Sequence, residues 1–310
     1  MNELVVLGSV NADHVLKIPS FPRPGETLTG SGYRVIPGGK GANQAVAAAR
    51  MGADVAFIAC VGDDDFGHSM KKAYSELGIN TDGVMTVANC PTGIAMIHVV
   101  DSGENCICLS PEANAALTND ALAPRLSMIE GAKVLLMQLE TPMETVKLAA
   151  ETAQKSQTTV VLNPAPAIEL DDSMLSLIDI ITPNETEAEV LTGIRVECEN
   201  SAQKASDVLH QKGVNTVMIT LGNKGAWLSE QGKNGRIIDG FRVRPLDTTA
   251  AGDTFNGAFV TELIKGSSVD SAVIIAHAAA AISVTREGAQ TSIPEKQDVD
   301  AFLDTHSLQQ

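Results

Sequence analysis

Short apolar runs alternate with helix-like stretches along most of this chain, and this rhythm constrains the fold more than any other feature. The runs have the length of buried strands, and the stretches between them carry apolar residues at helical spacing. They lie at residues 4–8, 55–58, 134–137, 159–162, 178–181 and 216–219. Strands that alternate with helices in this way form a parallel sheet covered by helices on both faces. We therefore predict an α/β fold with a doubly wound, mostly parallel sheet flanked by helices.

Two segments, residues 15–36 and 92–110, break this rhythm and are rich in strand-like sequence. The first contains prolines and two short extended pieces at residues 15–18 and 27–29, and the second is typical of a hairpin with its turn at residues 101–104. We predict that they form a small β-sheet that stands off the main domain. The main domain would then comprise residues 1–14, 37–91 and 111–310.

The composition supports a large core and limits the partners. Of the 310 residues 44% are apolar but only 3% aromatic, so Ala, Val, Leu and Ile must fill most of the core. Lys and Arg number 22 against 38 Asp and Glu, and the net charge of −16 argues against nucleic acid and anionic membranes as partners. The sequence shows no secretion signal and no run of roughly 18 apolar residues, so we expect a cytoplasmic protein. The five cysteines lack zinc-like spacing.

The stretch at residues 247–258 is predicted to contain a tight turn that opens a helix. Polar and apolar residues alternate at residues 241–244, which is typical of a strand end, and apolar residues then recur at helical spacing from Phe255. The small residues 250–252 would leave backbone N–H groups uncovered at a helix N-terminus, where the dipole favours an anion. Asp253 could there take a proton from a hydroxyl that attacks a phosphoryl group. Alternatively, Asp253 is an N-cap and the small residues only allow close packing.

A glycine-rich stretch, Gly38-Gly39-Lys40-Gly41-Ala42-Asn43, precedes a predicted helix at residues 44–51. It is not a dinucleotide fingerprint, because Gln44 stands where the third glycine belongs, and the chain contains no Walker A sequence. The glycines would let the backbone approach a ligand and act as a hinge. Asn43 suits a vicinal diol but could equally be an N-cap. Lys40 could neutralise a phosphate or pair with an acid, and the sequence leaves this open.

Polar residues follow several of the predicted strands, and in a doubly wound sheet such ends lie along one edge, where ligands bind. They are Asn11 and Asp13, Gln138 and Glu140, Asn163, Asn184 and Glu187, and the loop at residues 220–225. Asn11 and Asp13 could recognise hydroxyl groups or simply form turns. Asn184 and Glu187 share a face of a first helical turn, which also fits a capping box. The loop glycines suit a phosphate, although glycine-rich turns are common.

Three motifs resemble those of the ribokinase family of sugar kinases. They are Asp247-Thr248-x-x-Ala251-Gly252-Asp253, with Ala250 where many relatives carry glycine, the stretch at residues 38–47, and Asn184-x-x-Glu187. They occur in the family's order and at its spacing over essentially the whole chain. The stretches at residues 8–13 and 163–167 are similar too.

The resemblance implies ATP-dependent phosphorylation of D-ribose at O5, with Asp253 as the general base. It implies an anion hole formed by the amides of Ala250, Ala251, Gly252 and Asp253. The sugar would be held by Asn11, Asp13, Gly39, Lys40, Gly41, Asn43, Glu140 and Asp253. It also implies that the small sheet is a lid over the sugar and that two lids clasp to form a homodimer.

For ATP, the resemblance implies a site built from Asn184, Thr220, Leu221, Gly222, Asn223, Lys224, Gly225, Gly252 and His277. His277 would flank adenine, although a lone histidine is more often structural. Glu187 would hold Mg²⁺ through water. A monovalent cation, K⁺, would be held by carbonyl, hydroxyl and carboxylate groups at Asp247, Thr249, Ser283, Arg286, Gly288 and Ser292.

Three other functions compete with this interpretation. A sibling kinase for deoxyribose, fructose or a nucleoside would share the motifs, but the polar set around Asn11, Asp13 and Glu140 favours a small sugar, and aromatic residues to stack on a base are scarce. A sugar-binding protein without catalysis is disfavoured by the intact turn before Asp253. A nicotinamide dehydrogenase is disfavoured by the missing fingerprint.

Overall fold

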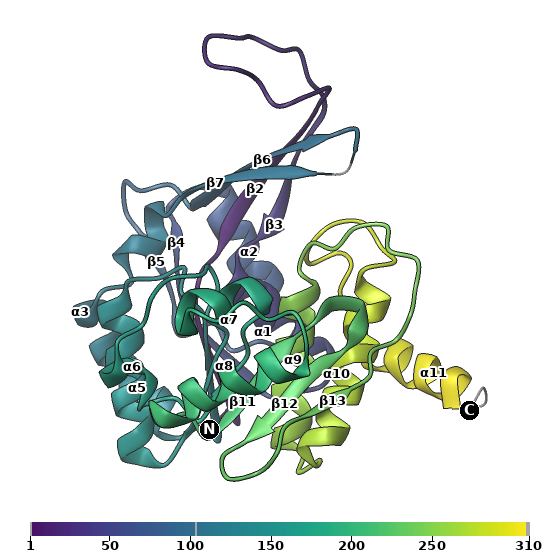
Figure 1. Cartoon of the computed structure of the whole chain (residues 1–310). Coiled ribbons are helices and arrows are strands. Elements are labelled where there is room, and N and C mark those ends of the chain that lie inside the picture. Colours follow the sequence, from purple (N-terminus) through teal and green to yellow (C-terminus); the bar gives the residue numbers. More distant parts are fainter. Residues whose placement is uncertain (1, 103, 308–310) are drawn as a thin grey trace.

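The computed structural model describes residues 2–102 and 104–307, which form a large α/β unit and a small sheet that projects from it (Figure 1). The large sheet has nine strands in the order β13-β12-β11-β10-β9-β8-β1-β4-β5, and those from β5 to β11 are parallel. At one edge, β12 pairs antiparallel with both β11 and β13. The predicted α/β fold is confirmed. The strands are β1 Leu4–Leu7, β4 Val55–Gly62, β5 Val84–Val87, β8 Val134–Met137, β9 Thr159–Leu162, β10 Ile180–Ile181, β11 Thr216–Thr220, β12 Ala226–Glu230 and β13 Arg236–Ile238.

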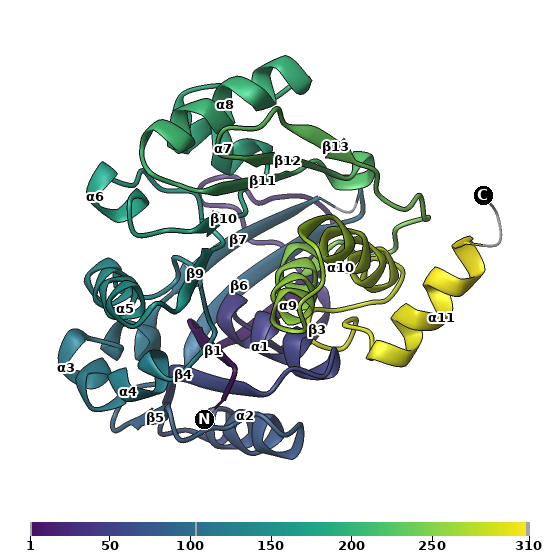
Figure 2. The same ribbon diagram turned by 90° about the horizontal axis from the view of Figure 1, so that it is seen from below.

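Helices cover both faces of this sheet, as seen from below in Figure 2. On one face lie α1 Lys40–Arg50, α2 Asp65–Glu76, α9 Ala251–Ile264, α10 Val269–Ser283 and α11 Lys296–Ser307. On the other lie α3 Asn119–Leu122, α4 Leu126–Glu130, α5 Met143–Ser156, α6 Asp172–Leu175, α7 Glu185–Thr192 and α8 Glu199–Gln211. Short 3₁₀ turns are η1 Glu112–Ala116, η2 Ala123–Arg125 and η3 Gly222–Lys224. Every helix in the described part of the chain is too short or too polar to cross a bilayer.

Strand β1 shows why the apolar runs are unbroken. Leu4 and Val6 belong to the core on the α1 and α9 side, whereas Val5 and Leu7 belong to the core on the opposite side. All four side chains are fully buried, because successive residues of a strand point to opposite faces. A strand in the middle of a two-sided sheet therefore has no position that faces water.

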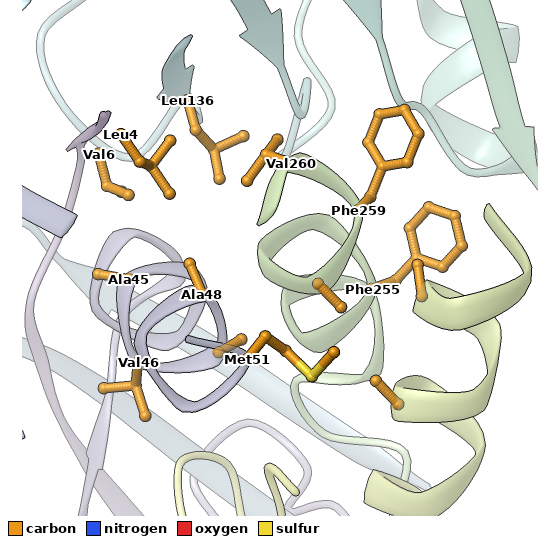
Figure 3. Close-up of a cluster of buried hydrophobic side chains, with 14 of the residues drawn as sticks. Leu4, Val6, Ala45, Val46, Ala48, Met51, Leu136, Phe255, Phe259 and Val260 are labelled. Carbon is orange, nitrogen blue, oxygen red and sulfur yellow. The ribbon is translucent and has the colours of Figure 1, made fainter. Parts of the chain in front are cut away.

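Helices α1 and α9 approach each other closely, with α1 over β1 and α9 over β8 (Figure 3). Gly257 of α9 makes this contact possible. A Cβ atom at position 257 would lie 2.5 Å from the Cβ of Ala47 and 2.6 Å from the carbonyl oxygen of Gln44. Real Cβ atoms do not approach neighbours so closely, so any larger residue would push the two helices apart. The distance between the two helices matters because each of them carries site residues at its N-terminal end.

The small sheet has four strands in the order β3-β2-β6-β7: β2 Asn11–Ile18, β3 Ser31–Gly38, β6 Gly93–Val100 and β7 Asn105–Ser110. The predicted hairpin is present as the antiparallel pair of β6 and β7, while β2 and β6 run parallel. The extended piece expected at residues 27–29 is wrong: those residues form a loop, since both edges of β2 are already paired with β3 and β6. The strand end expected at residues 241–244 is also wrong, because this stretch runs along a cavity and pairs with no strand.

Candidate active site

Asp253 lies in the first turn of α9, where the turn before the helix delivers it to the interior. Ala250 is the N-cap residue and has a left-handed backbone with φ of 59° and no capping side-chain hydrogen bond. The alternative that Asp253 is the N-cap is therefore wrong. The Asp253 side chain is 7% exposed, and its oxygens accept hydrogen bonds from Asn43 Nδ2 and Gln44 Nε2, both at 2.9 Å. Helix α1 thus holds the carboxylate through two neutral donors.

A chain of amide side chains lies behind Asp253 and was not predicted from the sequence. Gln44 Nε2 also donates to Asn163 Oδ1 at 3.0 Å, and Gln44 Oε1 accepts from Gln138 Nε2 at 2.5 Å. Gln138 and Asn163 follow β8 and β9, so they come from the strand ends that the sequence did single out. Their signal was a polar residue directly after a buried strand. In the sequence, Gln44 was noted only because it stands where a dinucleotide-binding fingerprint requires its third glycine.

A cleft of about 460 Å³ lies between the small sheet and the large unit. It is lined by seven of the eight residues predicted to hold the sugar, namely Asn11, Asp13, Gly39, Lys40, Asn43, Glu140 and Asp253. The eighth, Gly41, does not line the cleft but packs on the backbone of Gly8 and Ser9. The small sheet adds a largely apolar wall made of Ala95, Ile97, Asn105, Ile107 and Leu109. The cleft therefore combines a polar floor with an apolar roof, as small-molecule sites do.

Three carboxylates and one lysine determine the electrostatics of this cleft. Burial raises the pKa of Asp13 to about 7, and the nearby carboxylates of Glu140 and Asp253 add to the effect. Burial would lower the pKa of Lys40, but Asp253 and Glu140 outweigh it and raise that pKa above its usual value. Lys40 is therefore charged in this cleft, where the nearby acids stabilise its positive charge.

Glu140 and Asn11 are each fixed by a partner. Glu140 Oε2 accepts hydrogen bonds from Ser9 Oγ at 2.5 Å and from the backbone N–H of Lys40 at 3.1 Å. Asn11 Oδ1 accepts from Asn114 Nδ2 at 2.8 Å. Asn114 lies in η1, far from Asn11 in sequence, and nothing in the sequence marked it. These contacts orient two polar groups toward the cleft before any ligand arrives.

A second cavity of about 320 Å³ lies on the other side of the α9 N-terminus. Its polar end contains Ala251 and Gly252 together with four residues of the predicted phosphate loop, Thr220, Gly222, Asn223 and Gly225. Leu221 and Lys224 belong to the same turn, η3 and its N-cap. The rest of the lining is mainly apolar and contains Phe241, Val243, Pro245, Phe255, His277, Ala280, Ala281 and Val284. Both cavities reach Thr248, so only the turn that opens α9 separates them.

His277 is one of the residues that line this second cavity. Its ring contacts Phe255 edge-on, with centroids 5.0 Å apart, and it is 7% exposed. Burial lowers the pKa of His277 to about 4, so the imidazole is neutral at pH 7. Its Nε2 atom is buried without a hydrogen-bond partner among the described residues. A neutral ring with an unpaired nitrogen suits a flat heterocycle better than a phosphate.

Asn184 and Glu187 form the capping box of α7, as the structural alternative for this pair predicted. Asn184 Oδ1 accepts from the Glu187 N–H, and Glu187 Oε2 accepts from the Asn184 N–H, both at 2.8 Å. Burial raises the pKa of Glu187 above its usual value. Asn184 also forms an isolated parallel β-bridge with Thr220, which places the capping box beside the predicted phosphate loop. No group of three or more acidic, His or Cys residues gathers into a metal site in the described ranges. The pair fits a Mg²⁺ ion that takes most of its ligands from phosphates and water.

The residues predicted for a monovalent cation lie in two segments joined by Asp247. Asp247 Oδ1 accepts from the N–H and the hydroxyl of Thr249, and Oδ2 accepts from the N–H of Gly288 at 2.9 Å. Burial opposes the charge, but these hydrogen bonds outweigh it and hold the pKa of Asp247 below its usual value. The Arg286 side chain donates a hydrogen bond to Asp298. The other predicted positions, Ser283 and Ser292, are fully buried in the second segment. A carboxylate among loop carbonyls fits K⁺.

Comparison with known proteins agrees with this geometry. The family "pfkB family carbohydrate kinase" matches residues 1–296. A ribokinase of Haemophilus influenzae is 56% identical over 301 residues, which cover 97% of this chain and 98% of that protein. The crystal structure of a ribokinase from Thermotoga maritima has a TM-score of 0.90 at 39% identity and covers 98% of this chain and 100% of its own.

A second similar structure carries ligands. It is the Arabidopsis thaliana ribokinase complexed with ribose and ATP, with a TM-score of 0.90 at 32% identity, covering 97% of this chain and 98% of that one. The match to the family extends over both sheets, both cavities and the turn that carries Asp253. The chain belongs to the pfkB family of carbohydrate kinases.

Proposed function

We propose that this protein transfers the γ-phosphoryl group of ATP to O5 of D-ribose and so produces D-ribose 5-phosphate and ADP. One observation carries the proposal: a buried carboxylate lies in the turn that separates a cleft with a polar floor from a cavity lined by the predicted phosphate loop and by apolar residues. The complex of a similar ribokinase with ribose and ATP supports the assignment of the two ligands to the two cavities.

In the reaction, Asp253 accepts the proton of the ribose 5-hydroxyl as O5 forms its bond to the γ-phosphorus. The bond between that phosphorus and the bridging oxygen breaks, and ADP leaves with the electron pair. Charge that develops on the phosphoryl oxygens is stabilised by free amides at the start of α9. The N–H of Ala251 already donates to the Thr248 carbonyl at 3.3 Å, so we assign the anion hole chiefly to Gly252 and Asp253.

Two ions complete the proposed site. Mg²⁺ would neutralise the phosphates of ATP when bound, with Asn184 and Glu187 held beside the phosphate loop to position it through water. The loop that Asp247 ties to Gly288 would hold K⁺, and Thr249, one residue before the N-cap of α9, is part of the same hydrogen-bonded group. A cation there would fix the backbone that presents the anion hole.

The lid is proposed to join two copies of the chain, in the cytoplasm, as a homodimer. Large apolar side chains are exposed on it, including Tyr33 (61%), Val35 (41%) and Met96 (45%). By the strand register Val35 and Met96 are both cross-strand neighbours of His14, so they share one face. An exposed apolar face on a free-standing sheet favours association with a partner. Sedimentation equilibrium that returns twice 32.4 kDa would support this proposal, and the monomer mass would contradict it.

The function is tested by following ADP formation from MgATP with ribose, 2-deoxyribose, fructose and adenosine, each in KCl and in NaCl. We expect turnover selective for ribose and faster in KCl. Turnover on another sugar would keep the mechanism but overturn the substrate. Binding of ribose without turnover would favour a sugar-binding protein and reject the role of Asp253.

We further expect ribose binding to release protons near pH 7. The pKa of Asp13 in the free protein is about 7, and sugar hydroxyls that donate to an ionised carboxylate lower that pKa. Below pH 7 the protonated fraction grows, so the KM for ribose should rise by up to about tenfold per pH unit. Calorimetry in buffers of different ionisation enthalpy measures the released protons. Asp13→Asn should abolish the release, and a wild-type protein that releases none would contradict the assignment.

A further inference from the structure

The wall of the nucleotide cavity includes a segment without regular secondary structure. Residues 239–250 connect β13 to α9, and Phe241, Val243, Pro245 and Thr248 from this segment line the cavity. A wall made from such a segment needs anchors, because a free loop would sample many conformations and bind a ligand weakly.

The segment is anchored at its far end by backbone hydrogen bonds. The N–H groups of Leu246 and Asp247 donate to the carbonyl of Val284 at 2.7 and 3.2 Å, and Asp247 binds the N–H of Gly288. These contacts tie the segment to the C-terminal end of α10. They lie on the side of the wall next to the anion hole.

The near end of the segment is anchored by aromatic contacts with α11. The ring of Phe241 meets the ring of Phe302 edge-on, with centroids 5.1 Å apart and an interplanar angle of 80°. It meets the ring of His306 in the same way, at 5.4 Å and 77°. Phe302 and His306 stack on each other at 4.0 Å, and the His306 Nδ1 lies 2.8 Å from the Phe302 carbonyl oxygen that accepts from it. Edge-on aromatic pairs are favourable beyond the area they bury.

Helix α11 itself does not line the cavity. It lies beside α10 at the edge of the molecule, and Phe302 and Leu303 pack on the same core as Phe241 (Figure 2). The family match ends at residue 296, where α11 begins, so this contact lies outside what the family description covers.

We propose that α11 is a positioning element of the nucleotide site, in which Phe302 and His306 hold Phe241 in place as part of the wall of the ATP cavity. The inference rests on the proposed function, since it takes the cavity to be the ATP site. Phe241 lines the same cavity as Phe255 and His277, and the residue before it, Gly240, packs on Gly225 of the predicted phosphate loop, so a change in the position of Phe241 alters the wall of this cavity. The contacts of α11 should therefore affect the binding of ATP but not the binding of ribose.

The experiment compares steady-state kinetics of the full chain with Phe302→Ala, Phe302→Leu and the surface control Asp304→Ala. We expect the KM for MgATP to rise about fivefold to twentyfold in Phe302→Ala, because the ring that holds Phe241 is lost. The KM for ribose and kcat should stay within about twofold of wild type. Phe302→Leu keeps apolar volume but lacks the aromatic ring, so its KM for MgATP should lie between the values of wild type and Phe302→Ala. Asp304→Ala should behave as wild type.

A double-mutant cycle separates positioning from a general loss of structure. If Phe302 acts through Phe241, Phe241→Ala and the double variant should show the same KM for MgATP, so the effects are not additive. Additive effects, equal rises in both KM values, or an unchanged KM for MgATP in Phe302→Ala would each overturn the proposal. A wild-type protein without ribose kinase activity would instead overturn the proposed function. Melting temperatures of all variants identify any that are merely unstable.

Discussion

Replacing Asp253 by asparagine is expected to lower kcat by about two to four orders of magnitude while ribose binding is largely kept. The amide cannot accept the proton of the 5-hydroxyl, but it has nearly the same shape as the carboxylate. The fold should tolerate it, because Asn43 Oδ1 is buried without a hydrogen-bond partner in the described part of the chain. A flip of the Asn43 amide would let that oxygen accept from the new Nδ2 group, in place of the bond that Asn43 now donates.

Two measurements check this prediction together: initial rates of ADP formation and ribose affinity by calorimetry. Asp207→Asn, an exposed position on α8, is the matched control and should leave both values unchanged. Near-normal turnover in Asp253→Asn would exclude this residue as the base. Loss of turnover together with loss of ribose binding would indicate a structural role instead.

Gly257→Ala is expected to lower the free energy of unfolding by about 1–3 kcal/mol and to reduce kcat/KM at least tenfold. The added methyl group would lie 2.5 Å from the Cβ of Ala47 and 2.6 Å from the Gln44 carbonyl oxygen, so α1 and α9 must move apart. That movement separates Asp253, on α9, from Asn43 and Gln44, on α1. Urea unfolding and initial rates measure the two effects.

The companion change Ala47→Gly tests the cause. On its own, Ala47→Gly should lower the free energy of unfolding by about 1 kcal/mol, because glycine is a poor helix residue. Combined with Gly257→Ala it removes the methyl group that the new side chain meets, so part of the stability and activity should return. If the two changes simply add, the contact between positions 47 and 257 does not determine the spacing of the helices.

Much of the large unit could be predicted because its strands are buried on both faces. The runs at 134–137 and 159–162 coincide with β8 and β9, since a central strand has no exposed position to interrupt its apolar sequence. The piece at residues 27–29 failed for the opposite reason. A strand also needs a free partner, and whether one exists is a property of the assembled sheet.

The site was predictable where it consists of motifs and not where it consists of tertiary contacts. Asp253, Asn43 and Glu140 all line the cleft, as expected from local sequence. The hydrogen bond from Gln44 to Asp253 joins residues 209 positions apart, and only the approach of α1 to α9 creates it. The role of Gly257 is hidden in the same way, because a glycine in a helix shows what it contacts only after the helices are packed.

The cleft proposed to bind the sugar takes its polar groups from two bodies, the small sheet and the large unit, and this limits how its selectivity can be redesigned. Asn11 and Asp13 stand on β2 of the small sheet, which begins before the predicted boundary at residue 15, whereas Asn43, Glu140 and Asp253 belong to the large unit. If the small sheet closes over the sugar as proposed, a ligand that satisfies only one set would not bring the two bodies together and would forfeit the exclusion of water from phosphoryl transfer. An engineer who wants another sugar must therefore alter both bodies in concert, and libraries confined to either one should yield binders rather than catalysts.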